Sequence, residues 1–234
     1  MKKLILGIAL AAFGSAAFAQ TVLKTRNDSI NFALGVSIGN NLKQGGFENI
    51  NPEMIRQGMA AFYAGDKSVM DENASMGIIN GCMSEIQSKK AEEAKKAGEK
   101  NLAEGKKFLE ENKKKKGVTT TASGLEYEVI KMGNGVKPTE TDNVKTHYHG
   151  TLIDGTVFDS SVQRGQPVDF GVNQVIKGWT EALQLMPVGS KWKLYIPSEL
   201  AYGEQGAGGV IGPNCTLIFE VELIAINKPE GTDK

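Results

Sequence analysis

The stretch HYHGTLIDGTVFDSS, residues 147 to 161, decides the architecture of the C-terminal half of the chain. Its Asp154-Gly155 pair lies between two runs of strand-forming residues, and an Asp-Gly pair in that setting is a strong signal for a β-hairpin. The stretch also holds two histidines, two aspartates and two serines, which is enough side-chain chemistry for several classes of enzyme. The hairpin must therefore be placed in a sheet before any of these residues is given a role.

Alternating apolar and polar residues predict further strands on both sides of the hairpin. The strand-like segments are LEYEVI (125–130), VKTHYHGTLI (144–153), KWKLYIPS (191–198) and TLIFEVELIAI (216–226). Between them, VIKGWTEALQLM (175–186) places Ile176, Trp179 and Leu183 on one side of a helix. From residue 117 onward we expect an antiparallel sheet with a single short helix laid across it.

The N-terminal half of the chain, residues 27 to 116, carries helical patterns. Apolar residues recur every four positions from Ile30 to Leu42, and a short seam with spacing 3-4-3 runs from Met76 to Ile86. After Ile86 the seam fades into a run rich in lysine, glutamate and alanine, which are strong helix formers. The fold class is therefore α+β, with an all-α N-terminal part. Capping and stop signals divide this part into three helices, with Asn27 to Ser29, Asn51-Pro52 and Asp71 at the starts and Gly45-Gly46, Gly65 and Gly117 at the ends.

The three helices before residue 88 offer too little apolar surface for a core of their own. Two chains that share one core would solve this, so we predict a homodimer built by residues 27 to 88; the alternative is a helical hairpin that packs on the second domain. The charged run at residues 89 to 116 is predicted to be a solvated linker helix, with a disordered charged tract as the alternative. The expected domains are thus 20–88 for dimerisation, 89–116 for the linker helix and 117–234 for the sheet.

The N-terminal residues 1 to 19 have the pattern of a signal peptide. Two lysines at positions 2 and 3 precede an apolar run at residues 4 to 13, and Ala17-Phe18-Ala19 matches an A-x-A cleavage site. The mature chain would then start at Gln20 as an exported protein, periplasmic if the source is a Gram-negative bacterium; a retained membrane anchor is the alternative. Cys82 and Cys215 are expected to be free thiols, although a Cys82–Cys82 bond between two chains stays open.

Composition and motifs argue against several kinds of chemistry. The chain has 27 basic and 27 acidic residues, without the basic excess typical of nucleic-acid-binding domains. His147 and His149 share one face of a strand, but a metal site would need further ligands, and no spaced cluster supplies them. Ser160 and Ser161 lack the G-x-S-x-G context of a hydrolase nucleophile. The glycines at residues 203 to 209 lack the G-K-[ST] of a phosphate-binding loop, so neither a metal nor a cofactor is expected.

The order of four motifs carries a resemblance to a known family. HYHGTLIDGTVFDSS, QVIKGWTEAL, ELAYG and GPNCTLIFEVEL follow one another between residues 117 and 227, and together they closely resemble the FK506-binding-protein (FKBP) family of peptidyl-prolyl cis-trans isomerases. The N-terminal part resembles, more loosely, the dimerisation domain and linker helix of the exported macrophage infectivity potentiator (Mip)-like subgroup. The resemblance implies an antiparallel sheet wrapped around one short helix. It also implies rotation about X-Pro bonds, proline-containing unfolded polypeptides as substrates and FK506- or rapamycin-like inhibitors.

The resemblance also implies the residues of a prolyl pocket. Trp179 corresponds to the floor under the proline ring, the Ile176 backbone N–H to a donor for a substrate carbonyl, and the Tyr202 phenol to a ligand contact. Val168 stands where a phenylalanine is common and should make one wall shallower, and Ala207 stands where some members have histidine. Because Tyr148 alternates with the two histidines, the histidines should face away from the pocket. The implied catalytic residues are Tyr148, Phe158, Asp159, Tyr202 and Phe219, and the implied substrate-binding residues are Val168, Val175, Ile176, Trp179 and Ile211.

Two functions from different classes fit this resemblance. The first is an isomerase that assists the folding of exported proteins, in which an apolar aromatic pocket favours the twisted amide without covalent chemistry. The second is a binding module that captures proline-containing segments with little turnover. Four methionines of the helical part, at positions 54, 59, 76 and 83, could in addition help to hold unfolded chains.

Overall fold

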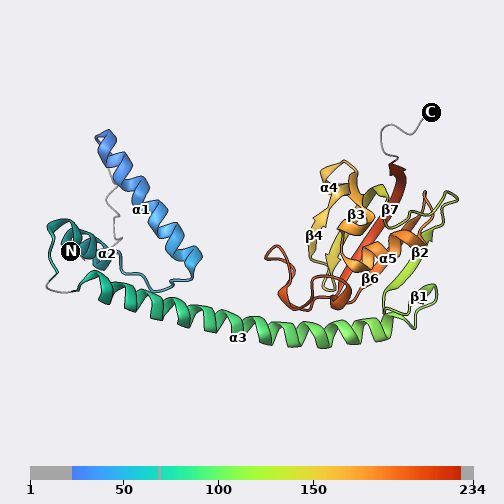
Figure 1. The fold of residues 1–234 in the computed structure, drawn as a ribbon, viewed down its shortest axis with the longest axis horizontal. Helices are drawn as coiled ribbons and strands as arrows, with labels where there is room; N and C mark the ends of the chain where they lie inside the picture. The colour runs from blue at the N-terminus through green and yellow to red at the C-terminus, as the bar shows by residue number, and fades with distance from the viewer. Residues whose placement is uncertain (1–22, 68–69, 228–234) are drawn as a thin grey trace, which may run out of the picture. The chain divides into compact units, whose positions relative to one another are not determined.

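The computed structural model describes residues 23–67 and 70–227. The chain divides into two compact units, Met1–Asn80 and Gly81–Lys234, and each is described by itself. The predicted signal peptide, residues 1 to 19, lies outside the described residues. Three helices and one seven-stranded sheet with short helices make up the described residues, which is the predicted α+β arrangement (Figure 1).

The helical part contains α1 (Arg26–Gly45), α2 (Pro52–Ala64) and α3 (Glu72–Asn112). The predicted caps of α2 and α3 are confirmed, because Asn51 Oδ1 accepts from the Glu53 N–H at 3.0 Å and Asp71 Oδ1 from the Ala74 N–H at 2.8 Å. The cap predicted for α1 is wrong by two residues. Thr25 is its N-cap, and it exchanges hydrogen bonds with Asp28 in a capping box.

Apolar side chains of α1 and α2 are exposed, and no residue of either helix is buried. On α1, Leu34 is 55% exposed and Val36 is 57% exposed, although these two residues lie on opposite sides of the helix. On α2, Phe62 is 77% exposed. Apolar residues on opposite sides of a helix are normally covered in a folded protein, and residues 23–67 and 70–227 leave these surfaces without a cover.

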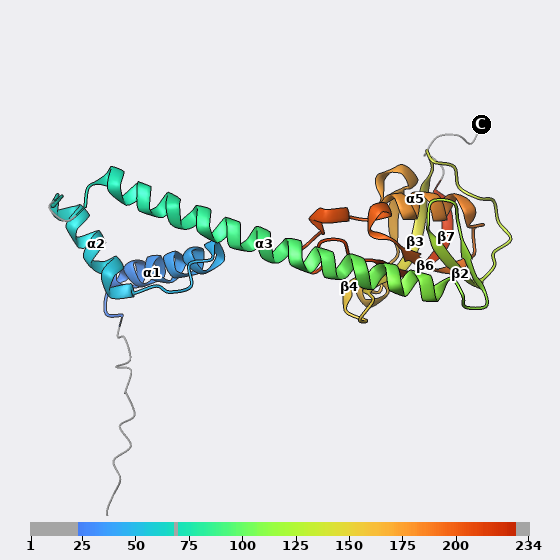
Figure 2. The same cartoon turned by 90° about the horizontal axis from the view of Figure 1, so that it is seen from below.

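The sheet is entirely antiparallel, with strand order β1-β2-β6-β7-β3-β4 and β5 paired to β3. Strands β2, β3, β6 and β7 of this sheet are labelled in Figure 2. Asp154 and Gly155 form the turn between β3 and β4, as predicted, and Asp154 Oδ1 accepts from the Thr156 N–H at 2.9 Å. The strands are β1 (Val118–Thr120), β2 (Glu126–Lys131), β3 (Asn143–Leu152), β4 (Val157–Ser160), β5 (Val168–Gly171), β6 (Lys191–Ile196) and β7 (Leu217–Asn227). The short helices are α4 (Ser161–Arg164), α5 (Lys177–Leu185), and the 3-10 turns η1 (Val172–Gln174), η2 (Ser198–Leu200) and η3 (Gly203–Gln205).

The predicted short helix, α5, lies across the sheet and closes the core (Figure 1). Its buried Trp179 and Leu183 pack with Leu194 of β6 and Val221 of β7. A Cβ on Gly178 would approach the Ile196 side chain to 2.5 Å, so the glycine lets the helix lie close to the sheet. The core is therefore a single layer between α5 and one face of the sheet.

The charged part of α3 is not a fully solvated spacer, contrary to our expectation. Gly98, Gly105 and Asn112 of this helix are buried, and all three lie within the second compact unit. They are seven residues apart, so they follow one line along the helix, while lysines and glutamates cover the remaining sides. These residues have no large apolar side chain, so the apolar pattern of the sequence does not show that they form a contact surface. The helix also ends at Asn112, short of the predicted residue 116.

Candidate active site

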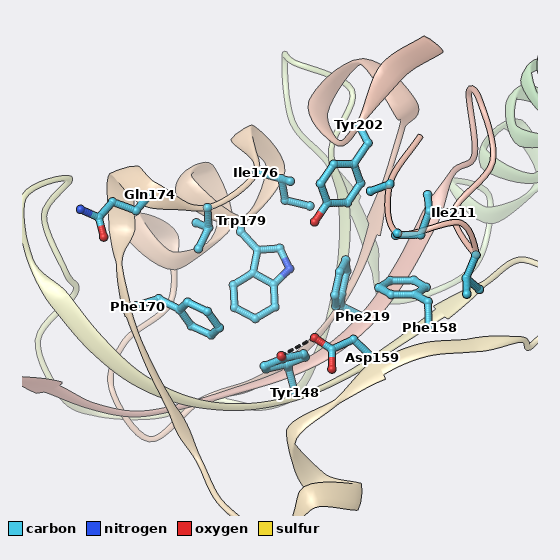
Figure 3. Close-up of a pocket in the computed structure, with 14 residues that line it drawn as sticks. Tyr148, Phe158, Asp159, Phe170, Gln174, Ile176, Trp179, Tyr202, Ile211 and Phe219 are labelled. Atoms are coloured by element: carbon cyan, nitrogen blue, oxygen red, sulfur yellow. Dashed lines mark hydrogen bonds between the residues drawn. The ribbon is translucent and has the colours of Figure 1, made fainter. Parts of the chain in front are cut away.

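A pocket of about 570 Å³ opens on the face of the sheet domain that carries α5 (Figure 3). Aromatic and aliphatic side chains dominate its lining, with one carboxylate at the edge. The lining residues are Tyr148, Phe158, Asp159, Phe170, Gln174, Val175, Ile176, Trp179, Tyr202, Ala207, Gly208, Val210, Ile211 and Phe219. They come from the strands β3, β4, β5 and β7, from η1, from α5 with the two residues before it, and from Tyr202 with the loop after it.

Nine of the ten residues implied by the sequence meet in this pocket, and Val168 does not line it. Val168 packs against the core beside it. The wall on this side is Phe170, two residues further along β5, whose ring centroid lies 5.8 Å from Trp179 and 5.9 Å from Tyr148. The shallower wall expected from Val168 is thus replaced by an aromatic one. Sequence reasoning missed Phe170 as a site residue, together with Gln174, Gly208 and Val210.

The aromatic rings meet edge to face around Trp179, which is only 4% exposed. Its ring centroid lies 5.4 Å from Tyr148 at 84° and 5.2 Å from Phe219 at 79°, and Phe219 contacts Phe158 at 5.3 Å and 82°. Such perpendicular pairs are favoured by the aromatic quadrupole and hold the rings in fixed orientations. The result is a rigid apolar cavity with Trp179 between its walls, as Figure 3 shows.

One polar group, the Asp159 carboxylate, is fixed at the edge of the pocket by two neighbours. The Tyr148 hydroxyl donates to Asp159 Oδ2 at 2.5 Å (Figure 3), and Arg164 forms an ion pair with Asp159 Oδ1. Arg164 also donates to the Tyr148 hydroxyl at 2.8 Å, and its guanidinium lies 5.6 Å from the Tyr148 ring centroid. No sequence pattern indicated Arg164, because the four-residue helix α4 brings its side chain back to Asp159.

Electrostatics keeps the pair in one protonation state at neutral pH. Burial raises the pKa of Asp159, but the hydrogen bonds from Tyr148 and Arg164 outweigh it and hold this pKa below its usual value. Burial and the Asp159 carboxylate both raise the pKa of Tyr148. The pocket therefore presents an ionised carboxylate and a neutral phenol that donates to it.

This assignment predicts a constant charge in the pocket at neutral pH. Between pH 5 and 8 the Asp159 carboxylate should stay ionised, because its lowered pKa lies below this range. The lowered pKa also means that the carboxylate stabilises the fold above its unfolded pKa of about 3.9, and that this contribution disappears as the pH falls through the folded value. Denaturation of wild-type protein and Asp159→Ala at pH 7 and pH 3 measures this. A stability difference that grows at pH 3 would contradict the assignment.

The histidines and serines of the opening stretch hold the backbone together outside the pocket. His147 Nδ1 lies 3.0 Å from Ser161 Oγ, and His149 Nδ1 lies 3.0 Å from Ser160 Oγ. Ser161 Oγ also accepts from the Tyr148 backbone N–H at 2.7 Å. Neither histidine lines the pocket, as predicted, and residues 23–67 and 70–227 contain no group of three or more potential metal ligands.

The glycine-rich loop after Tyr202 forms the side of the pocket opposite Tyr148 (Figure 3). Ala207 and Ile211 exchange two backbone hydrogen bonds, of 2.8 and 3.0 Å, and the Asn214 N–H closes the base of the loop on the Gly203 carbonyl at 2.8 Å. Gly208 and Gly209 have φ angles of 60° and 73°, and a Cβ on either would meet nothing within 4 Å. The loop is thus a closed hairpin-like flap that places Ile211 over the aromatic rings.

Comparisons with known proteins agree with this fold. Residues 134–224 match the family model described as FKBP-type peptidyl-prolyl cis-trans isomerase, and residues 27–129 match the domain amino terminal to FKBP-type peptidyl-prolyl isomerase. The chain belongs to the FKBP-type peptidyl-prolyl cis-trans isomerases. Its isomerase activity and its role in protein folding follow from this membership.

The similar proteins fall within the Mip- and FkpA-type isomerases. The outer membrane protein MIP of Legionella longbeachae is 42% identical over 224 residues, covering 96% of this chain and 95% of that protein. The FKBP-type 22 kDa peptidyl-prolyl cis-trans isomerase of Escherichia coli is 48% identical over 83% of this chain and 93% of its own length. The crystal structure of FkpA from Escherichia coli has a TM-score of 0.64 and 37% identity, covering 88% of this chain and 99% of FkpA.

Proposed function

We propose that the aromatic pocket is the prolyl site of this isomerase. The observation that carries the proposal is the set of perpendicular rings around Trp179 next to one fixed carboxylate. A proline ring sits on Trp179 between the aromatic walls, and the Tyr202 hydroxyl and the Ile176 backbone N–H hold the flanking peptide. The proposed catalytic residues are Tyr148, Phe158, Asp159, Tyr202 and Phe219, with Val175, Ile176, Trp179 and Ile211 binding substrate and Val168 supporting the wall from behind.

Such a site accelerates rotation without breaking a covalent bond. Amide resonance sets a rotation barrier of about 18–20 kcal/mol, and uncatalysed exchange of X-Pro bonds takes about 10–100 s. Charge separation between the amide oxygen and nitrogen decreases as the bond twists, so an apolar pocket favours the twisted state over the planar one. Acceleration to milliseconds requires about 10⁴-fold, or about 5–6 kcal/mol. Shape, exclusion of water and two or three hydrogen bonds supply energies of this size.

The full-length mature protein should accelerate exchange of a short X-Pro peptide, and an FK506-like compound should inhibit it by competition. The reason is that the inhibitor and the proline ring would occupy the same cavity. A protease-free exchange assay by NMR measures both effects. If the folded protein binds the compound but does not accelerate exchange, the pocket is a proline-segment binder rather than the site of catalysis.

We further propose a homodimer formed by residues 27 to 88, joined through residues 89–116 to a catalytic domain at 117–234. The exposed apolar side chains on both sides of α1 support this proposal, as do glycines that leave room for a close helix partner: a Cβ on Gly35 or Gly39 would meet nothing within 4 Å. The methionines of this region would let the dimer hold unfolded chains while the pocket isomerises them. Sedimentation as a monomer at micromolar concentration would overturn the dimer.

Export is part of the same proposal. A signal peptide at residues 1 to 19 would send the mature chain out of the cytoplasm and, in a Gram-negative bacterium, into the periplasm. The name of the similar Legionella protein, an outer membrane protein, agrees with a location outside the cytoplasm. Within residues 23–67 and 70–227, no helix has the length and apolar character that a membrane span requires.

A further inference from the structure

The C-terminal part of α3 carries a continuous contact surface, which we call the stalk seam. It consists of Gly98, Asn101, Gly105, Phe108 and Asn112, with spacings of 3, 4, 3 and 4 residues. Residues with this spacing share one face of a helix. In the described structure each of them contacts the sheet domain, and together they span about four turns.

The first half of the stalk seam holds residues 213 to 216. Asn101 Nδ2 donates to the Pro213 carbonyl at 2.8 Å and lies 3.3 Å from Cys215 Sγ. A Cβ on Gly98 would come within 3.1 Å of Pro213 Cβ. The helix and this segment therefore pack closely, because little room is left for a side chain at position 98.

The second half of the stalk seam anchors the helix to strands β2 and β6 of the sheet. The Phe108 ring lies 5.9 Å from that of Tyr195. Asn112 Nδ2 donates to Glu126 Oε2 at 2.8 Å, and both residues are at least 98% buried. Burial raises the pKa of Glu126, so the Asn112 amide partly replaces the water that this carboxyl has lost. A buried polar pair of this kind fixes the register of the helix on the sheet.

The segment held by the helix is the base of the flap that lines the pocket. Pro213 is two residues beyond Ile211, which covers the aromatic rings. Asn214 closes the flap on Gly203 and is, among the described residues, the non-glycine residue with a positive φ, 55°. Its side-chain amide reaches back to the Gly98 carbonyl at 3.4 Å. The Asn214 side chain thus contacts the helix, and its backbone N–H closes the flap.

We propose that the stalk seam positions the flap, so that the last four turns of α3 set the affinity of the pocket for its peptide. Asn101 and Gly105 are positioning residues, since they act on substrate through the base of the flap. Asn101 does so by its bond to Pro213, and Gly105 by its contact with Thr216. This inference rests on the assignment of the pocket as the prolyl site. It makes the helix part of the catalytic unit rather than a passive connector between two domains.

Gly105→Ala tests this inference. The added methyl group would overlap the Oγ1 of buried Thr216 and move the helix away from the flap base. The KM for a Leu-Pro tetrapeptide should rise at least threefold while kcat stays within twofold, and the amide NMR signals of Gly208 and Gly209 should shift. The double variant Gly105→Ala with Thr216→Ala removes the overlapping oxygen and should restore both the KM and the signals.

Gly81→Ala is the matched control, because the same methyl group on the same helix would meet nothing within 4 Å. If Gly105→Ala does not fold, Asn101→Ala decides instead, since it removes the bond to Pro213 without adding bulk. A folded variant with unchanged KM and unshifted flap signals would overturn the inference. Failure of the wild-type protein to isomerise the peptide would count against the prolyl site alone, because the flap signals still report on the stalk seam.

Discussion

Alanine in place of Asp159 should lower kcat/KM for exchange of a short X-Pro peptide by about 10- to 100-fold. The carboxylate accepts from the Tyr148 hydroxyl and pairs with Arg164, so it sets the field at the edge of an otherwise apolar pocket. Loss of one hydrogen-bonded charge is worth about 1.5–3 kcal/mol, which corresponds to this range of rates. Phe158→Ala should produce a loss of about tenfold or more, because it opens the wall next to Phe219 and admits water.

Asp169→Ala provides the control for the charge. Asp169 is an exposed carboxylate on β5 whose partner in the structure is Asn227, and it does not line the pocket. Its replacement should leave kcat/KM within about twofold, since surface substitutions of this kind have small effects. Circular dichroism and thermal unfolding show whether each variant is folded. Equal activity of folded Asp159→Ala and wild-type protein would remove Asp159 from the catalytic residues.

Glutamate in place of Leu34 should convert the proposed dimer into monomers. Leu34 is 55% exposed on the stripe of α1 and would be buried by a second copy of the chain. Burial of an unpaired charge costs several kcal/mol, so association should weaken at least about 100-fold. Sedimentation velocity at micromolar concentration measures the change. Isomerisation of a short peptide should persist, while refolding of a proline-limited whole protein should become less efficient.

Met132→Glu is matched to this change, since it introduces the same charge at an apolar residue with 60% exposure in the sheet domain. The control should sediment like the wild-type protein. If Leu34→Glu remains a dimer, the stripe on α1 is not the interface, and the apolar seam of α3 between Met76 and Ile86 becomes the next segment to test.

Sequence alone predicted the long strands, α5 and most of the pocket, because these depend on local alternation, on a D-G turn and on motifs in a fixed order. It did not predict the place of Arg164, because a four-residue helix brings that side chain to Asp159 and leaves no periodic signal. It also placed Val168 in the pocket instead of Phe170. The two residues share one face of β5, and the motif does not show which of them reaches the cavity.

The contact of α3 with the sheet was missed for a different reason. Hydropathy records a glycine as neutral and an asparagine as polar, so Gly98, Asn101 and Gly105 read as part of a solvated charged run. In the structure the glycines are buried because the side chains of Pro213, Asn214 and Thr216 fill the space where theirs would be. A contact that depends on a missing side chain can be recognised only when the structures of the helix and of the segment facing it are both known.

The flap glycines have a consequence for the chirality of the residues that this loop can accept. Gly208 and Gly209 have open space around them, so volume does not exclude a side chain. Their positive φ angles are what disfavour one, and that penalty applies to L-amino acids and not to their mirror images. D-alanine introduced there by chemical ligation should fit without strain and should stiffen the loop, whereas L-alanine should force it to rearrange. At these two positions the flap is therefore selective for handedness rather than for size.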